Sequence, residues 1–294
     1  MSPDPAAQGG VLPAVVPLRL PSAATLFAHR SNRLRALAAG HAAQDWLLAL
    51  ADLCAAQEEA VRTVPAPLPH RELARSAPLR AAEWPRSEAF PAALAVLLQR
   101  LSARPLPTLA RDAVHFLVAA APPELSALSD ALLAGRFDPS LAAAAPFLAA
   151  ALQVYFTSLA AQLDPRGVEP ATRGCPVCAS PAVAGAIQGD DKVRYLRCGL
   201  CGCDWHLVRV ECATCRSGAS LSYAAIAGAP AGTRAEVCAG CKTYLKIFSL
   251  EDLPGAEPLA DDVASLALDL LLAEEGYARG GLNLLLAPPT SSGP

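Results

Sequence analysis

The sequence predicts an α+β chain of several units: a helical N-terminal domain, two small β-rich modules with four cysteines each, and a C-terminal helix. The chain has 294 residues, which is more than one domain usually holds. Its hydrophobic fraction is 53% while only 5% of the residues are aromatic, a composition that suits packed alanine-rich helices better than a sheet sandwich. Nine of the ten cysteines lie between residues 175 and 241, where short β-like runs replace the helical pattern.

The first unit, residues 1–170, is predicted to be an all-α domain. Its apolar side chains fall at positions i, i+3, i+4 and i+7, the spacing of one helix face. The clearest sets are Leu47, Leu50, Ala51 and Cys54, and Leu94, Leu97, Leu98 and Leu101. A further helix is expected from Pro122 to Gly135, because proline is common at the start of a helix and glycine just after its end.

One stretch of this domain, between Asp138 and Asp164, carries no charge and is long enough to cross a bilayer. Most of its apolar residues are alanine, and it contains Pro146 and polar side chains such as Gln153. We therefore predict a buried core helix and no membrane insertion. The first ten residues lack the basic and apolar regions of a secretory or twin-arginine leader, so the chain is expected in the cytoplasm.

Residues 171–250 are predicted to form two tandem modules, about 171–210 and 211–250. The runs with β character are Val193–Arg197, Trp205–Val210, Leu221–Ala225 and Tyr244–Phe248. The last unit, 251–294, is predicted to be a helix from about Leu259 to Gly276 and a tail. An apolar stripe along this helix needs a partner, which we expect in the N-terminal helices; the stripe consists of Val263, Leu266, Leu270 and Leu271.

The chemical signal of the sequence is a set of four Cys-x-x-Cys pairs. Each such turn aims two thiolates at one point, and two turns joined by a hairpin supply the four tetrahedral ligands that zinc or iron accepts. Pairing in sequence order, as in rubredoxins and zinc ribbons, leaves gaps of hairpin length at 179–197 and 216–237. The predicted metal ligands are Cys175, Cys178, Cys198 and Cys201 in site 1, and Cys212, Cys215, Cys238 and Cys241 in site 2.

Other arrangements of these cysteines are less consistent with the sequence. A RING-like cross-brace would pair the turns in a different order. A disulfide framework is disfavoured in a reducing cytoplasm, and a thioredoxin motif needs a βαβ context that is absent here. Cys203 could replace Cys201 as a ligand, but a spare thiol is the preferred interpretation. Cys54 is expected to be a small buried hydrophobe.

Four charged or polar side chains near the cysteines are expected to have structural roles. His206 is expected to be a packing or surface residue, because four cysteines already fill each site. Arg194, Arg197 and Arg209 are expected on a solvated strand face, where they balance some of the charge of the sites.

Several classes of function are disfavoured by the sequence. No Ser-His-Asp set, phosphate-binding glycine loop or pair of catalytic carboxylates stands out, so an enzyme is not expected. Residues 165–250 carry 10 basic and 6 acidic side chains, and two four-thiolate sites of charge about −2 each would offset that excess, so no nucleic acid is expected as a partner. The main alternative function is a rubredoxin-like electron carrier, since iron held by four thiolates can cycle by one electron.

Three segments of the chain have specific sequence patterns: the run RYLRCGLCGCDWHLVRVECATC at 194–215, the run EVCAGCKTYLK at 236–246, and DDVASLALDL at 261–270 followed by Glu275-Gly-Tyr277. In these segments the chain strongly resembles the FdhE family of formate dehydrogenase accessory proteins. The segment with Leu20-Pro21 and Phe27 to Arg33 is also similar to this family, though less specifically. The likeness covers nearly the whole chain, and Cys203 stands where another small residue is expected.

The resemblance implies a helical N-terminal domain followed by two rubredoxin-like modules that each bind iron, with zinc as the alternative ion. Only the eight cysteines of the four pairs are carried over as ligands. The resemblance also implies a cytoplasmic chaperone that assists enzyme maturation. Its partner would be the catalytic subunit of a respiratory formate dehydrogenase that is exported by the Tat pathway.

Overall fold

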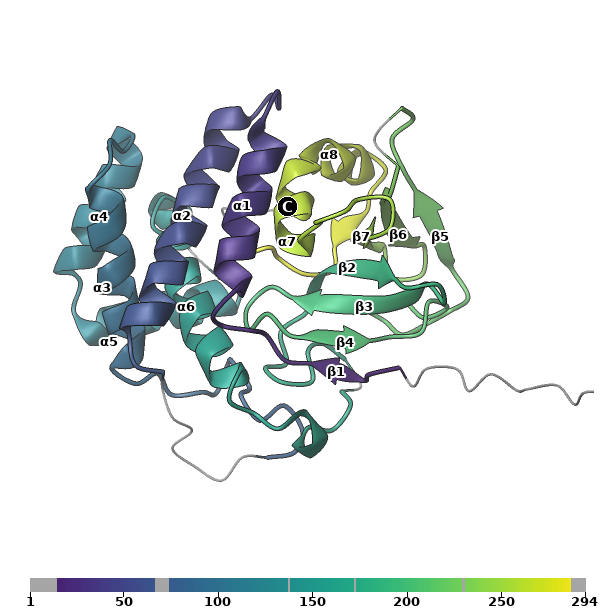
Figure 1. Ribbon diagram of the computed structural model, residues 1–294, viewed down its shortest axis with the longest axis horizontal. Helices are drawn as coiled ribbons and strands as arrows, with labels where there is room; N and C mark the ends of the chain where they lie inside the picture. The colour runs from purple at the N-terminus through teal and green to yellow at the C-terminus, as the bar shows by residue number, and fades with distance from the viewer. Residues whose placement is uncertain (1–14, 67–73, 137, 172, 229–230, 287–294) are drawn as a thin grey trace, which may run out of the picture.

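The computed structural model describes residues 15–66, 74–136, 138–171, 173–228 and 231–286. Six helices lie on one side of the molecule and a twisted sheet lies on the other, with two C-terminal helices packed between them (Figure 1). The predicted order of helices, β-rich cysteine region and C-terminal helical segment is confirmed.

The N-terminal helices surround one buried helix, α6. Helices α2, α3 and α5 all contact it, and every residue of α6 except Pro146 is buried. The helices are α1 Leu26–Ala38, α2 Gln44–Thr63, α3 Ala89–Ser102, α4 Thr108–Ala119, α5 Pro122–Leu133 and α6 Ala145–Ala160. The uncharged stretch is thus a core helix, as predicted. In the part of the chain that the structure describes, no helix has both the length and the apolarity that a membrane span requires.

The sheet is built from two copies of one unit: a Cys-x-x-Cys turn, two strands, a second such turn, and a third strand. The first unit supplies β2 Ala182–Gln188, β3 Val193–Cys198 and β4 Asp204–His206, and the second supplies β5 Leu221–Ala224, β6 Thr233–Cys238 and β7 Thr243–Ser249. The strand order is β1-β4-β3-β2-β7-β6-β5, so the two units lie side by side.

The two units join through a parallel pairing of β2 with β7. A side chain at Gly185 in β2 would come within 2.6 Å of the Ile247 side chain on β7, so a glycine permits this close approach. The sheet is completed by β1, Leu18–Arg19, which pairs with β4, and by β8, Ala278–Arg279, which pairs with β7. One sheet therefore spans both cysteine modules. The predicted domain boundaries at residues 170, 210 and 250 stay a prediction.

The predicted strand Trp205–Val210 is shorter than expected. It ends at His206, because the chain then turns inward: Leu207 is buried, and the Arg194 side chain donates hydrogen bonds to the carbonyl oxygens of Leu207 and Val208. These carbonyl groups are therefore not available to a neighbouring strand.

The C-terminal segment forms two helices instead of the single one predicted, α7 Pro258–Ala264 and α8 Leu266–Glu274. They are separated at Ser265, whose hydroxyl donates to the carbonyl of Asp261. The buried Lys246 ammonium donates to the carbonyl of Asp262 at 2.5 Å. These side-chain hydrogen bonds compete with the backbone hydrogen bonds at this point, which favours a break in the helix.

The apolar stripe of this segment is only partly as predicted. Val263 on α7 is fully buried, and α7 contacts α1, which confirms a partner among the N-terminal helices. Leu270 and Leu271 on α8 are exposed, however. The buried apolar residues of α8 are instead Leu268 and Leu272, which pack against the sheet beside the buried Asp269, because the break at Ser265 changes the direction of the second helix.

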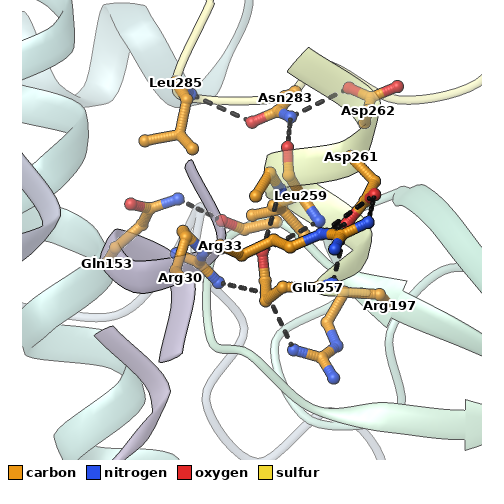
Figure 2. A network of polar contacts seen from close by, with 12 residues as sticks. Arg30, Arg33, Gln153, Arg197, Glu257, Leu259, Asp261, Asp262, Asn283 and Leu285 are labelled. Atoms are coloured by element: carbon orange, nitrogen blue, oxygen red, sulfur yellow. Dashed lines mark hydrogen bonds and ion pairs between the residues drawn. The ribbon is translucent and has the colours of Figure 1, made fainter. Parts of the chain in front are cut away.

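Helix α7 is fastened to α1 and β3 by buried ion pairs (Figure 2). The Arg30 guanidinium donates to both carboxylate oxygens of Glu257 at 3.1 Å, and Arg197 on β3 donates to the same carboxylate at 3.3 Å. Arg33 makes a second bidentate pair with Asp261. Burial opposes ionisation of Glu257, but Arg30 and Arg197 hold its pKa below the usual range. The helical part and the sheet are thereby joined by charge as well as by apolar packing.

Candidate metal centres

The four Cys-x-x-Cys turns, called knuckles below, share one backbone geometry. In three of them, the amide four residues after the first cysteine donates to that cysteine's carbonyl, at 2.9 to 3.0 Å. The residue after each second cysteine has a positive φ, which reverses the chain so that both thiols face the same point. These residues are Ala179 at 64°, Gly202 at 74°, Arg216 at 68° and Lys242 at 55°.

The structure gathers the eight predicted cysteines into two groups of four, in the sequential pairing that the spacing predicted. Within each group all four Sγ atoms lie within 4.8 Å of one another. In site 1 the Cys175–Cys201 and Cys178–Cys198 Sγ atoms are 3.5 and 3.4 Å apart. In site 2 the Cys212–Cys241 and Cys215–Cys238 separations are both 3.8 Å.

These separations fit a tetrahedral metal ion better than a disulfide. A disulfide bond brings two sulfur atoms to about 2.05 Å, and all ten cysteines are free. Four sulfurs around an ion at about 2.3 Å would lie about 3.8 Å apart. Soft thiolates in a tetrahedral set suit zinc or iron. Each four-cysteine cluster could therefore hold a metal ion.

Site 1 is part of the main hydrophobic core. Backbone amides of Val177, Leu200 and Cys201 point at its sulfur atoms at 3.4 Å. The side-chain amide of Gln153, from the buried helix α6, donates to the carbonyl of Gly199 at 2.7 Å. A helix of the N-terminal part thus holds a knuckle of site 1 directly.

A second contact with the N-terminal part lies along the first knuckle. The amides of Ala77, Leu79 and Ala81 donate to successive carbonyls of residues 176–178 at 2.9 to 3.1 Å. At the other knuckle, a side chain at Gly202 would come within 2.7 Å of Leu26 on α1, so the close packing there requires a glycine. Site 1 is enclosed by the helical part on both sides.

Site 2 lies in the second unit of the sheet and is less enclosed. Cys215 and Cys241 are half-buried, in contrast to Cys212 and Cys238. The Thr214 amide points at the Cys212 sulfur at 3.4 Å, and the Thr243 hydroxyl lies 3.0 Å from the Cys241 sulfur.

Each cluster favours one thiolate near neutral pH. Burial opposes ionisation of Cys175, yet hydrogen bonds from neighbouring thiols lower its pKa to about 6. Burial likewise opposes ionisation of Cys241, while the Thr243 hydroxyl and the thiols of Cys238 and Cys215 lower its pKa to about 7. Because metal ligands must be deprotonated, these thiolates favour the binding of a cation.

Cys203 is not one of the four clustered residues of site 1. It is fully buried beside the cluster, and its backbone carbonyl accepts a hydrogen bond from the Cys198 amide at 2.9 Å. In the second unit, Thr243 occupies the corresponding position, two residues after the last cysteine of the site, and contacts Cys241. The spare thiol of the sequence is therefore a polar neighbour of the cluster.

Two arginines of the module lie elsewhere than predicted. Arg194 is fully buried and forms an ion pair with Glu236 on β6, which joins the two units, and burial raises the pKa of Glu236 against the attraction of Arg194. Arg197 is half-buried and pairs with Asp204 and Glu257. The expected solvated face is therefore wrong for both, because each arginine has a buried carboxylate partner; Arg209 is exposed as expected.

The other single residues behave as predicted. Cys54 is fully buried on α2, and burial raises its pKa to about 12. His206 is half-buried and its ring packs against Tyr195 at a centroid distance of 6.2 Å. The buried Gln153 was named in the sequence only as a polar residue of the uncharged stretch. Gln153 stands on a helix with few other large polar side chains, and this signal in the sequence could have identified it as a residue with a buried hydrogen-bond partner.

Comparison with known proteins gives a consistent result along the chain. Three family models match it: FdhE N-terminal at residues 15–173, FdhE central domain at 174–209 and FdhE C-terminal domain at 210–286. A Protein FdhE homolog of Pseudomonas putida is 40% identical over 288 residues, covering 92% of this chain and 90% of that protein. One from Edwardsiella ictaluri is 35% identical and covers 97% and 96%.

A solved structure is also similar. The crystal structure of the FdhE protein from Pseudomonas aeruginosa matches with a TM-score of 0.85 and 38% sequence identity. The match covers 93% of this chain and 99% of that one.

Proposed function

The chain belongs to the FdhE family, and from this premise we propose that it is a metal-binding accessory protein that assists the maturation of a respiratory formate dehydrogenase. The two four-cysteine clusters are the observation that carries the proposal. We propose all eight clustered cysteines as ligands, with one iron ion in each site and zinc as the alternative. A bound ion would crosslink two knuckles and fix the surface around them.

The proposed partner is the catalytic subunit of the dehydrogenase, met in the cytoplasm before export by the Tat pathway. This follows from the family resemblance rather than from a particular surface. The protein would act as a chaperone on that subunit and would not oxidise formate itself.

A pull-down tests the proposal. Metal-loaded wild-type protein should capture the catalytic subunit, and the Cys238→Ser/Cys241→Ser double mutant should capture less, because an unfolded segment presents no fixed surface. Cys54→Ser is the matched control, since it changes a cysteine outside both clusters, and it should bind like wild type. Formate oxidation by the purified protein should be absent.

One result would contradict this function, and a second would contradict the role of site 2 in it. If wild type captures no formate dehydrogenase subunit, and deletion of the gene leaves formate oxidation intact, the accessory role is wrong. If the double mutant binds as well as wild type, the interaction does not depend on site 2.

A rubredoxin-like electron carrier is the second candidate. The half-buried positions of Cys215 and Cys241 favour it, because electron transfer needs a site near the surface. Iron-loaded protein should then accept one electron per redox-active iron site from a physiological donor and be reoxidised reversibly. A protein that shows no reversible reduction would exclude this candidate and leave the accessory role unaffected.

A further inference from the structure

The two cysteine sites differ in their access to solvent. All four cysteines of site 1 are at most 1% exposed. In site 2, Cys212 and Cys238 are buried as well, at 4% and 1% exposure, but Cys215 and Cys241 are half-buried. Two cysteine residues of site 2 are therefore partly open to solvent, whereas all four of site 1 are buried.

The sites also differ in how tightly the surrounding chain holds them. Site 1 is fixed from outside its own module by Gln153, which donates to the carbonyl of Gly199, and by the amides of residues 77–81 along its first knuckle. Three amides point at its sulfur atoms. At site 2, the Thr214 amide points at a sulfur atom at 3.4 Å, and the Ala278 amide donates to the carbonyl of Lys242 at 2.9 Å. Among the described residues, fewer hydrogen bonds from outside its module therefore hold site 2.

A third difference lies at equivalent positions of the knuckles. The residue after each second cysteine has a left-handed backbone conformation, and in site 1 these residues are the small Ala179 and Gly202. In site 2 they are the basic Arg216 and Lys242. Lys242 is exposed and lies 5.1 Å from the ring of Tyr277, while Arg216 is half-buried and pairs with Glu211 at 2.9 Å. These positive charges partly offset the formal charge of about −2 of a metal-loaded four-thiolate site, so an approaching anionic ligand meets less repulsion there.

We propose that the two sites have different roles: site 1 keeps its ion as part of the core, and site 2 is the place where the protein exchanges its ion with external anionic ligands. The inference rests on one part of the proposed function, namely that both clusters bind a metal ion. In the exchange, a donor atom of the incoming ligand forms a bond to the ion as the bond from the Sγ of Cys215 or Cys241 breaks. The released thiolate then takes a proton from solvent, and no electron is transferred.

Timed alkylation during chelation tests the inference on the full-length protein. Protein holding two zinc ions per chain is mixed with EDTA, samples are pulsed with N-ethylmaleimide, and the modified cysteines are identified by peptide mass spectrometry. The cysteines of site 2 should be modified at least tenfold faster than those of site 1, and zinc release should show two phases of one ion each. Equal rates, or faster labelling of site 1, would overturn the inference.

A variant separates local exchange from unfolding of the whole chain. Cys241→Ser should abolish the fast phase of zinc release and leave the slow phase at its wild-type rate. If the remaining ion of the variant is released as fast as the fast phase of wild type, zinc release follows unfolding of the whole chain. The proposed division of roles is then wrong. A wild-type chain that holds fewer than two ions after loading would instead contradict the metal binding in the proposed function.

Discussion

Glu257→Gln removes one negative charge from the buried network between α1 and α7 while keeping the size of the side chain. Glu257 is 1% exposed and accepts hydrogen bonds from two guanidinium groups, those of Arg30 and Arg197. It also caps α7, because its carboxylate accepts from the amides of Leu259 and Ala260 at 3.1 and 2.9 Å. A glutamine oxygen can still cap the helix, so the substitution isolates the effect of charge.

The expected loss of stability is about 3 kcal/mol, at the lower end of the 3–5 kcal/mol for a buried pair that loses one partner. The reason is that the Arg30 charge remains buried without its counter-charge, while Arg197 keeps its pair with Asp204. With an unfolding entropy of about 2.1 cal/mol/K per residue, a chain of this length should melt about 5 °C lower. Thermal unfolding of metal-loaded protein, followed by circular dichroism, measures the shift.

Glu58→Gln is the matched control. Glu58 pairs with Arg62 at 3.3 Å on the surface of α2, where the arginine side chain is 64% exposed. The control should cost about 0.5 kcal/mol or less. If Glu257→Gln lowers the melting temperature no more than Glu58→Gln does, the buried network does not stabilise the fold and the reasoning fails.

The ion pair of Glu257 predicts how the stability of the protein depends on pH. The folded-state pKa of Glu257 lies below its unfolded value, so its ionic contribution is fully present above the unfolded pKa, about 4.3. The contribution is lost as the pH falls through the folded pKa. The difference in melting temperature between wild type and Glu257→Gln should therefore be constant near neutral pH and shrink below about pH 4. A difference that grows in acid would contradict this sign.

Three further predictions concern single side chains. Because burial raises its pKa to about 12, Cys54 should resist N-ethylmaleimide at pH 8 until denaturant is added, and modification at the rate of a free thiol would show that α2 opens readily. Gln153→Leu leaves the buried carbonyl of Gly199 unpaired and should cost about 1–3 kcal/mol in urea unfolding, so a change within error would contradict the role of this link. Thr243→Val removes the hydroxyl 3.0 Å from the Cys241 sulfur and should speed zinc loss to a chelator from site 2 alone; an unchanged rate would mean that the hydroxyl does not support the thiolate.

The cysteine clusters could be predicted from sequence because their geometry is local. A Cys-x-x-Cys turn places its two thiols by itself, and the gap between two turns admits a hairpin, so the grouping needed no knowledge of distant residues. The helices of the N-terminal part were predictable for a similar reason, since the apolar spacing around Leu47 and Leu94 lies within single helices.

Features that depend on distant partners could not be predicted in the same way. The parallel pairing of β2 with β7 joins segments about 60 residues apart, and the sequence of β2, AVAGAIQ, has few residues typical of strands. The burial of Arg194 depends on Glu236, 42 residues later in the chain. The break at Ser265 depends on Lys246, which approaches from a strand. In each case the local pattern was compatible with more than one outcome.

The ion pair between Arg30 and Glu257 joins positions 227 residues apart. A ribosome that adds about 5–20 residues per second reaches Glu257 about 10–45 s after Arg30. Throughout that time Arg30 on the nascent helix α1 lacks the Glu257 carboxylate, and α1 lacks the apolar surface of α7. The nascent protein therefore completes its helical half only after both cysteine modules have been synthesised, and any truncation before residue 257 leaves Arg30 without its native partner.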